Sequence, residues 1–150
     1  NYIEKNSFPK DTRALIEKPN FISNISGFEN LKLLASIQNK ITDDKILETL
    51  KKVDLYEERN KKYGEYSLGM KQKLGIAQVL MEEPKCLILD EPFNGIDRKS
   101  VEKIKKILLE EKNDGKLIII TSHIKEDIET LSDYIYEFDC GVLQKYVKED

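Results

Sequence analysis

Two adjacent carboxylates follow a short apolar segment near the middle of the chain. Residues 86–89 are all apolar, and Asp90, Glu91 and Pro92 come directly after them. An uninterrupted apolar run of this length predicts a strand that is buried on both faces, as in a parallel sheet. Pro92 ends the strand and forces a turn. Because open α/β sheets bind ligands at the carboxyl ends of their strands, one of these carboxylates is suited to hold a metal ion and the other to act on a water molecule.

The carboxylate pair could simply be a solvated sheet edge without any chemistry. Other polar residues at suitable spacings along the chain are therefore needed to support a functional interpretation. His123 is the only histidine of the chain and follows a second apolar run, residues 117–120. A lone histidine is usually structural. One at the end of a neighbouring parallel strand, however, faces the same crevice as Asp90 and Glu91. Its position therefore favours a shared site.

Two further segments place polar residues at the starts of predicted helices. Ser67 and Gly69 open a helix whose free amides and partial positive charge suit a phosphate group. A capping serine with an early glycine is the structural alternative for this segment. Asp97 is expected to cap the next helix whatever else it does.

The remaining pattern predicts an α/β protein whose two parts differ in composition. Residues from about 20 to 80 are mostly helical, and residues from about 84 to 150 alternate strand and helix, which is typical of a parallel sheet with crossovers. The expected strands lie at 13–16, ending at Glu17, and at 86–89 and 117–120, the last two with both faces buried. A helix with a Ser26–Glu29 capping box is expected to carry an apolar stripe of Leu31, Leu33, Leu34 and Ile37. The other expected elements are a helix capped by Thr42, helices opening at Ser67 and Asp97, a helix at about 124–131, and a hairpin that turns at 139–141.

Composition argues against several classes of function. The 150 residues carry 25 basic and 28 acidic side chains, a net charge of −3, which does not predict a nucleic-acid partner. Cys86 and Cys140 have no metal-site or disulfide spacing, which fits a reducing cytosol. No apolar run approaches the ~20 residues of a membrane helix. If the protein works at a membrane, another component must anchor it.

These segments, in this order, resemble the ATP-binding cassette of ABC transporters over nearly the whole chain. Residues 86–91 resemble the Walker B strand, and residues 66–70 resemble the signature motif. Residues 94–97 resemble the D-loop, and His123 the switch histidine. The resemblance implies a P-loop NTPase (RecA-like) parallel sheet, with the α-helical subdomain at about 20–80 and the second half of the catalytic core at about 84–150.

The resemblance also implies roles for the residues that match each motif. Asp90 would hold Mg²⁺ through water, Glu91 would act as general base on the attacking water, and His123 would contact the γ-phosphate of ATP. In phosphoryl transfer, such positioning and charge neutralisation supply most of the catalysis.

Other roles implied by the resemblance involve partners. Ser67 and Gly69 would contact ATP held by a second nucleotide-binding domain in a dimer, and Asp97 would couple the two sites. A membrane permease would be the other partner. The expected location is cytoplasmic, peripheral on the inner face of the cell membrane.

Three positions depart from the usual motifs of the family. Leu68 stands where the signature motif has glycine and Met70 where it has glutamine, while Glu17 occupies the place of the Q-loop glutamine. These replacements resemble ATPases that export, or protect against, peptide antibiotics such as bacitracin and lantibiotics. Glu17 retains an oxygen that could ligate Mg²⁺, although its charge changes the local electrostatics.

The sequence contains no Gly-x-x-x-x-Gly-Lys-Ser/Thr motif, which is the Walker A loop of the family. Gly115-Lys116 is the only Gly-Lys pair, and Leu117 stands where the motif needs serine or threonine. The pair also precedes a predicted strand, whereas a P-loop follows one. In the family this loop precedes the Q-loop and would lie before Asn1. The chain is therefore expected to be part of a larger cassette, to bind ATP poorly alone, and to associate through unpaired strand edges.

Two other functions remain open from the sequence. One is an ABC-type ATPase that acts on DNA or ribosomes, and the other is a non-catalytic interaction domain in which the carboxylates are structural. Replacing Glu91 by glutamine separates the enzymatic functions from the non-catalytic one.

Overall fold

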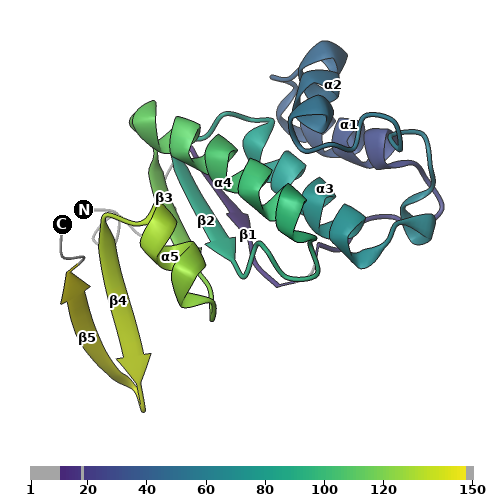
Figure 1. Cartoon of the computed structure of the whole chain (residues 1–150). Helices are drawn as coiled ribbons and strands as arrows, with labels where there is room; N and C mark the ends of the chain where they lie inside the picture. The colour runs from purple at the N-terminus through teal and green to yellow at the C-terminus, as the bar shows by residue number, and fades with distance from the viewer. Residues whose placement is uncertain (1–10, 18, 148–150) are drawn as a thin grey trace.

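Three parallel strands form the centre of the protein. The computed structural model describes residues 11–17 and 19–147. The strands β1 (Thr12–Leu15), β2 (Cys86–Asp90) and β3 (Leu117–Thr121) lie in the order β1-β2-β3 (Figure 1). Leu15 pairs with Leu89, and Asp90 pairs with Thr121. The predicted parallel sheet is confirmed, although β1 begins and ends one residue earlier than expected.

The sheet packs one face against the helices. Helix α3 (Leu68–Leu80) contacts β1, and helix α4 (Arg98–Asn113) contacts β3. Leu87 and Leu89 of β2 are 0% and 1% exposed in the resulting core. Side chains of a strand alternate between its faces, so these leucines account for only half of the apolar run.

The opposite face of the sheet is poorly covered, so the prediction that both strands are buried on both faces is wrong. Ile88 of β2 is only partly buried, and Leu117 and Ile119 of β3 are 59% and 49% exposed. Ile118 and Ile120 point the other way and pack against the core. Each apolar run is continuous because its side chains alternate between the two faces of the sheet. The described residues cover only one of these faces.

The helical part contains α1 (Gly27–Gln38) and α2 (Asp43–Lys52), which contact each other and α3. The capping box is confirmed: Ser26 Oγ accepts from the backbone N–H of Glu29, and a Glu29 carboxylate oxygen accepts from that of Ser26. The predicted stripe of α1 is partly wrong, since Leu33 and Ile37 are 50% and 77% exposed while Leu31 is fully buried.

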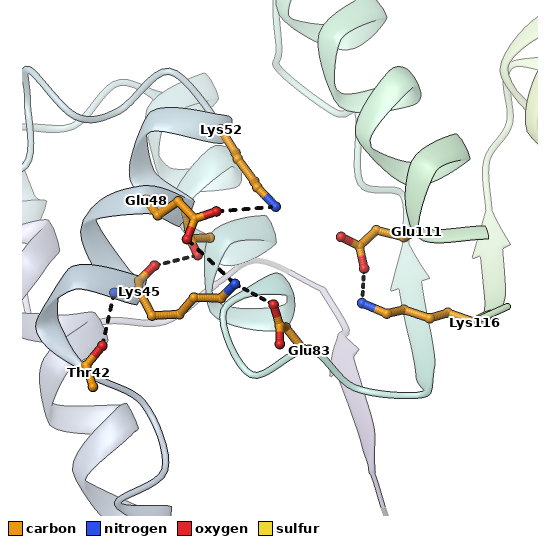
Figure 2. Close-up of polar contacts among 8 residues, drawn as sticks. Thr42, Lys45, Glu48, Lys52, Glu83, Glu111 and Lys116 are labelled. Atoms are coloured by element: carbon orange, nitrogen blue, oxygen red, sulfur yellow. Dashed lines mark hydrogen bonds and ion pairs between the residues drawn. The ribbon is translucent and has the colours of Figure 1, made fainter. Parts of the chain in front are cut away.

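Ion pairs connect α2 and its C-terminal turn to the rest of the protein. Lys45 pairs with Glu83, in the turn before β2, and Asp54 pairs with Lys103 of α4. Figure 2 shows Lys45 between Glu83 and Glu48 of its own helix. A 3₁₀ helix (Tyr63–Glu65) leads from this region towards α3.

The C-terminal part adds α5 (Lys125–Leu131) and a hairpin of β4 (Tyr134–Asp139) and β5 (Val142–Val147). The predicted turn is confirmed, with Cys140 and Gly141 at φ 46° and 82°. The hairpin forms its own sheet beside β3 (Figure 1). A groove of about 1050 Å³ lies between β3 and β4. Within the described ranges, no helix has the length and apolar character needed to cross a bilayer.

Candidate active site at the carboxyl edge of the sheet

The ends of β2 and β3 are joined by the side chain of Thr121. Its hydroxyl donates to Asp90 Oδ1 at 2.5 Å and accepts from the backbone N–H of Glu91 at 3.1 Å. The carbonyl of Thr121 also accepts from this N–H at 3.2 Å. The two carboxylates are therefore held at the edge by the neighbouring strand, where parallel sheets bind ligands.

Glu91 and His123 meet at this edge. His123 Nδ1 lies 2.9 Å from Glu91 Oε2, with the donor set by the histidine tautomer. The His123 side chain is 67% exposed and the Glu91 side chain 33% exposed, so both remain open to a ligand. The predicted convergence of Asp90, Glu91 and His123 on one edge is therefore observed.

The backbone at Glu91 adopts an uncommon conformation. Its φ is +45°, a region that residues other than glycine rarely occupy. The carbonyl of Glu91 accepts from Gln72 Nε2 and from the backbone N–H of Asn94, both at 3.3 Å. Such backbone strain persists only where the surroundings hold it, and it is concentrated at functional sites.

Gln72 and Thr121 were not among the site residues predicted from the sequence. Gln72 is 5% exposed on an otherwise apolar side of α3, and Thr121 is the last residue of β3. A polar residue at the end of a strand next to β2 was a signal for Thr121. A buried glutamine among leucines and isoleucines was a weaker signal for Gln72.

The start of α3 lies against the loop that follows Glu91. Ser67 caps α3 as predicted, its hydroxyl accepting from Met70 N–H at 3.2 Å. A Cβ on Gly69 would lie 2.8 Å from the carbonyl oxygen of Gly95, and one on Gly95, whose φ is +74°, would lie 2.5 Å from Leu68 Cδ2. The two glycines therefore permit a contact between the segments that resemble the signature motif and the D-loop.

Asp97 begins α4 and has the capping role predicted for it. Asp97 Oδ1 accepts from Ser100 N–H at 3.0 Å. Hydrogen bonds from Ser100 hold the pKa of Asp97 below its usual value. The charged carboxylate is therefore favoured at the positive end of the helix.

Glu17 lies on the same edge of the sheet as Asp90, two residues beyond the end of β1. It is exposed and has a φ of +57°. The chain returns to α3 just after it, where Pro19 is so close to Gly75 that a Cβ on this glycine would lie 2.4 Å from Pro19 Cγ.

The donor atoms at this edge fit Mg²⁺ only in combination with a ligand that brings more oxygens. The described residues contain no cluster of three or more acidic, histidine or cysteine side chains that could enclose a metal. Asp90 and the Thr121 hydroxyl offer hard oxygen donors in contact with each other. Mg²⁺ is commonly held by one or two carboxylates with phosphates and waters, so the set fits that mode of binding.

Comparison with known proteins identifies the family of the chain. A family model described as ABC transporter matches residues 1–94, more than half of the chain. The chain belongs to this ABC transporter family. The structure is similar to that of the ATP-binding cassette MJ0796, solved as a dimer in a post-hydrolysis state bound to ADP and Pi, with a TM-score of 0.79 at 23% identity over 89% of this chain and 62% of that one.

Curated relatives of this ABC transporter protein share more of its sequence. The uncharacterized ABC transporter ATP-binding protein YybJ of Bacillus subtilis is 44% identical over 92% of this chain and 63% of its own length. The bacitracin transport ATP-binding protein BcrA of Enterococcus faecalis is 43% identical over 81% of this chain and 40% of its own. The lantibiotic transport ATP-binding protein SrtF of Streptococcus pyogenes is 38% identical over 81% and 53%. The chain therefore spans about half the length of these relatives.

Proposed function

We propose that this chain forms part of an ATPase that hydrolyses ATP to drive a membrane transporter. The contact between Glu91 and His123, beside Asp90 held by Thr121, is the observation that carries the proposal. These contacts bring two carboxylates and an imidazole together on one solvent-open edge. Membership of the ABC transporter family supports the same function.

In the proposed mechanism, Glu91 orients the attacking water and accepts its proton. His123, in contact with Glu91 Oε2, holds this carboxylate and presents its imidazole to the γ-phosphate. Asp90 and Glu17 are the residues that would hold Mg²⁺, and the ion would supply charge neutralisation for the phosphates. Thr121 fixes Asp90 and the backbone of Glu91, so little reorganisation is needed when ATP binds.

Ser67, Gly69 and Asp97 are proposed to serve the nucleotide site of a second nucleotide-binding domain. Ser67 and Asp97 are exposed at two helix starts, and Gly69 lies against the loop that joins Glu91 to Asp97. A helix start with free amides is suited to the phosphates of a facing subunit. We therefore propose a dimer in which these residues complete the site of the partner.

The groove between β3 and β4 is proposed to hold the strand that leads into a phosphate-binding loop. Its walls include the apolar side chains of β3 and β4, and its volume is about 1050 Å³. A strand paired with β3 would direct its following loop to the edge that carries Asp90. The nucleotide site is then complete only with this addition, and the chain alone binds ATP weakly.

An apolar stripe on the helical subdomain is proposed to contact the membrane permease. Ile22, Leu33 and Ile37 are 48%, 50% and 77% exposed. Asn30 bonds both the N–H and the carbonyl of Ile22, which fixes that segment on α1. Large apolar side chains exposed on one helix and on the segment bonded to it are suited to an interaction surface. The permease would place the protein on the inner face of the membrane.

The proposed substrate class is a peptide antibiotic. Relatives with 43% and 38% identity are named for bacitracin and lantibiotic transport. The replacements Glu17, Leu68 and Met70 point to the same group of ATPases.

Glu91→Gln tests the proposal in a cassette that joins this chain to a strand and Walker A segment. ATP turnover should fall about 100-fold or more, because general-base catalysis is lost, while ATP binding is retained. Glu83→Gln, away from the edge, is the matched control and should leave turnover unchanged. Normal turnover in Glu91→Gln would refute the role given to Glu91.

A further inference from the structure

Two oppositely charged side chains are buried between α4 and α5. Lys105 and Asp127 have side chains only 6% and 8% exposed, and Lys105 Nζ lies 2.7 Å from Asp127 Oδ1. Lys105 Nζ also lies 3.3 Å from Glu102 Oε1. Burial opposes the charge of Lys105, but the hydrogen bonds that Lys105 donates to Asp127 and Glu102 outweigh it and raise the pKa of Lys105. The pair is therefore a directional, charge-assisted contact inside the protein.

The two helices joined by this pair begin at two of the candidate site segments. Helix α4 starts directly after Asp97, and α5 starts two residues after His123. Helix α5 has only seven residues, and Ile124 gives it no side-chain cap. So short a helix is not stable by itself, and its position depends on what it packs against.

Helix α5 is fastened to α4 near both ends. Besides the Asp127 contact, Lys112 of α4 donates to the carbonyl of Leu131 at 3.2 Å and lies 2.8 Å from Asp133 Oδ1. The Lys112 contacts are at the C-terminal end of α5, where Asp133 is exposed. The Lys105–Asp127 pair is the buried contact, and it lies four residues after His123.

The imidazole of His123 has little packing of its own. Its side chain is 67% exposed, so its place is set by the backbone on either side. On the upstream side, Thr121 is fixed by its bonds to Asp90 and Glu91. On the downstream side, the chain enters α5 at once. The position of α5 therefore decides where the His123 backbone leaves the sheet.

We propose that Lys105 and Asp127 are a positioning pair that holds α5 on α4 and so keeps His123 against Glu91. This inference rests on the proposed role of His123 in the ATPase. Because an ion pair with hydrogen bonds fixes direction as well as distance, it sets the register of α5 more tightly than an apolar contact would. It also links the position of His123 to α4, the helix that Asp97 caps.

The test uses the 150-residue chain with its single histidine labelled with ¹⁵N in the ring. The Nδ1 resonance of His123, recorded without nucleotide, reports on the contact with Glu91. Glu91→Gln gives the change expected when the contact is lost. Asp127→Asn should produce a change in the same direction and of comparable size, in a sample whose amide spectrum remains that of a folded protein.

A second variant separates positioning from stability. Lys105→Met with Asp127→Leu replaces the pair by apolar groups of similar volume and should stay folded. It should retain thermal stability yet still shift the Nδ1 resonance, because α5 can slide. Lys103→Met, which removes an exposed ion pair of α4, is the matched control and should leave the resonance unchanged.

A wild-type His123 resonance in the folded apolar double variant would overturn the proposal and leave the pair a purely structural one. Since the measurement involves no ATP, its failure is distinct from the failure of the proposed ATPase function. A normal turnover of Glu91→Gln would remove the catalytic role while leaving this geometric link testable.

Discussion

Thr121 is the residue on which the geometry of the two carboxylates depends. Its hydroxyl serves both Asp90 and the backbone of Glu91. Thr121→Val keeps the shape of the side chain but removes both bonds, and should lower the free energy of unfolding by about 1 kcal/mol. Urea denaturation measures this. Thr130→Val removes a hydroxyl that bonds only a helix carbonyl, and a loss as large as that in Thr121→Val would contradict the assignment.

Asp97 makes the stability of α4 depend on pH. The pKa of this carboxyl is lowered by the Ser100 hydrogen bonds, so its contribution is present above the ordinary aspartate pKa of about 3.9 and is lost as the pH falls through the lower folded value. Asp97→Asn should be less stable than wild type at pH 7, and the difference should shrink in acid. Thermal melts across this range measure it.

A cap that does not titrate provides the comparison for Asp97. Ser67→Ala removes the N-cap of α3, and its loss of stability should be the same at pH 7 and in acid. If the difference between Asp97→Asn and wild type stayed constant over the acid range, the charged form of Asp97 would not be the source of its contribution.

At the residue scale, the sequence predicted which polar residues lie together better than it predicted the hydrogen bonds that hold them there. Asp90, Glu91 and His123 could be placed together because each follows an apolar strand. The bonds from Thr121 and Gln72 depend on strand register and on the packing of α3, which a sequence does not contain. The same limit applies to Asp127, whose position four residues after His123 gives no sign that Lys105 reaches it.

At the element scale, local chemistry explains why the helices begin where they do. Ser26, Thr42, Ser67 and Asp97 all cap helices as their sequence patterns predict. The direction in which a helix faces is a tertiary property, and there the prediction for α1 failed. Asn30 and Ala35 are buried beside Leu31, while Leu33 and Ile37 are exposed. The buried face of α1, which packs against α2 and α3, is therefore narrower than the predicted apolar stripe.

Apolar packing rather than ion pairing should hold α2 on the protein. Ile46 is fully buried in the core, whereas Lys45 and Glu83 form a pair that is open to solvent (Figure 2). Ile46→Ala should lower the free energy of unfolding by about 3 kcal/mol. Lys45→Met should lower it by less than about 1 kcal/mol, since exposed ion pairs contribute little. Chemical denaturation of both variants measures the difference.

Leu33→Ala is the control for the α2 comparison. It removes an apolar side chain of similar size to Ile46, but one that is 50% exposed on α1. Its effect should be well below that of Ile46→Ala. Equal losses for Lys45→Met and Ile46→Ala would show that the ion pair, and not the core, fixes the helix.

At the scale of the whole molecule, large apolar side chains are exposed on one face of β3 and on the hairpin. Leu117 and Ile119 lie on β3, and Tyr134, Phe138 and Leu143 lie on the hairpin across the groove, all at least 49% exposed. Unpaired strand edges with apolar side chains promote association. The chain should therefore form oligomers at high concentration, which light scattering after size exclusion measures.

Charges on the exposed face of β3 should reduce this association. Leu117→Lys with Ile119→Lys places two positive charges on the edge strand, where they repel a second copy and leave the core contacts of Ile118 and Ile120 in place. Leu33→Lys with Ile37→Lys, on the stripe of α1, is the matched control and should leave the oligomers unchanged. A strictly monomeric wild type would contradict the prediction. Monomers in the control but not in the β3 variant would place the association on α1 instead.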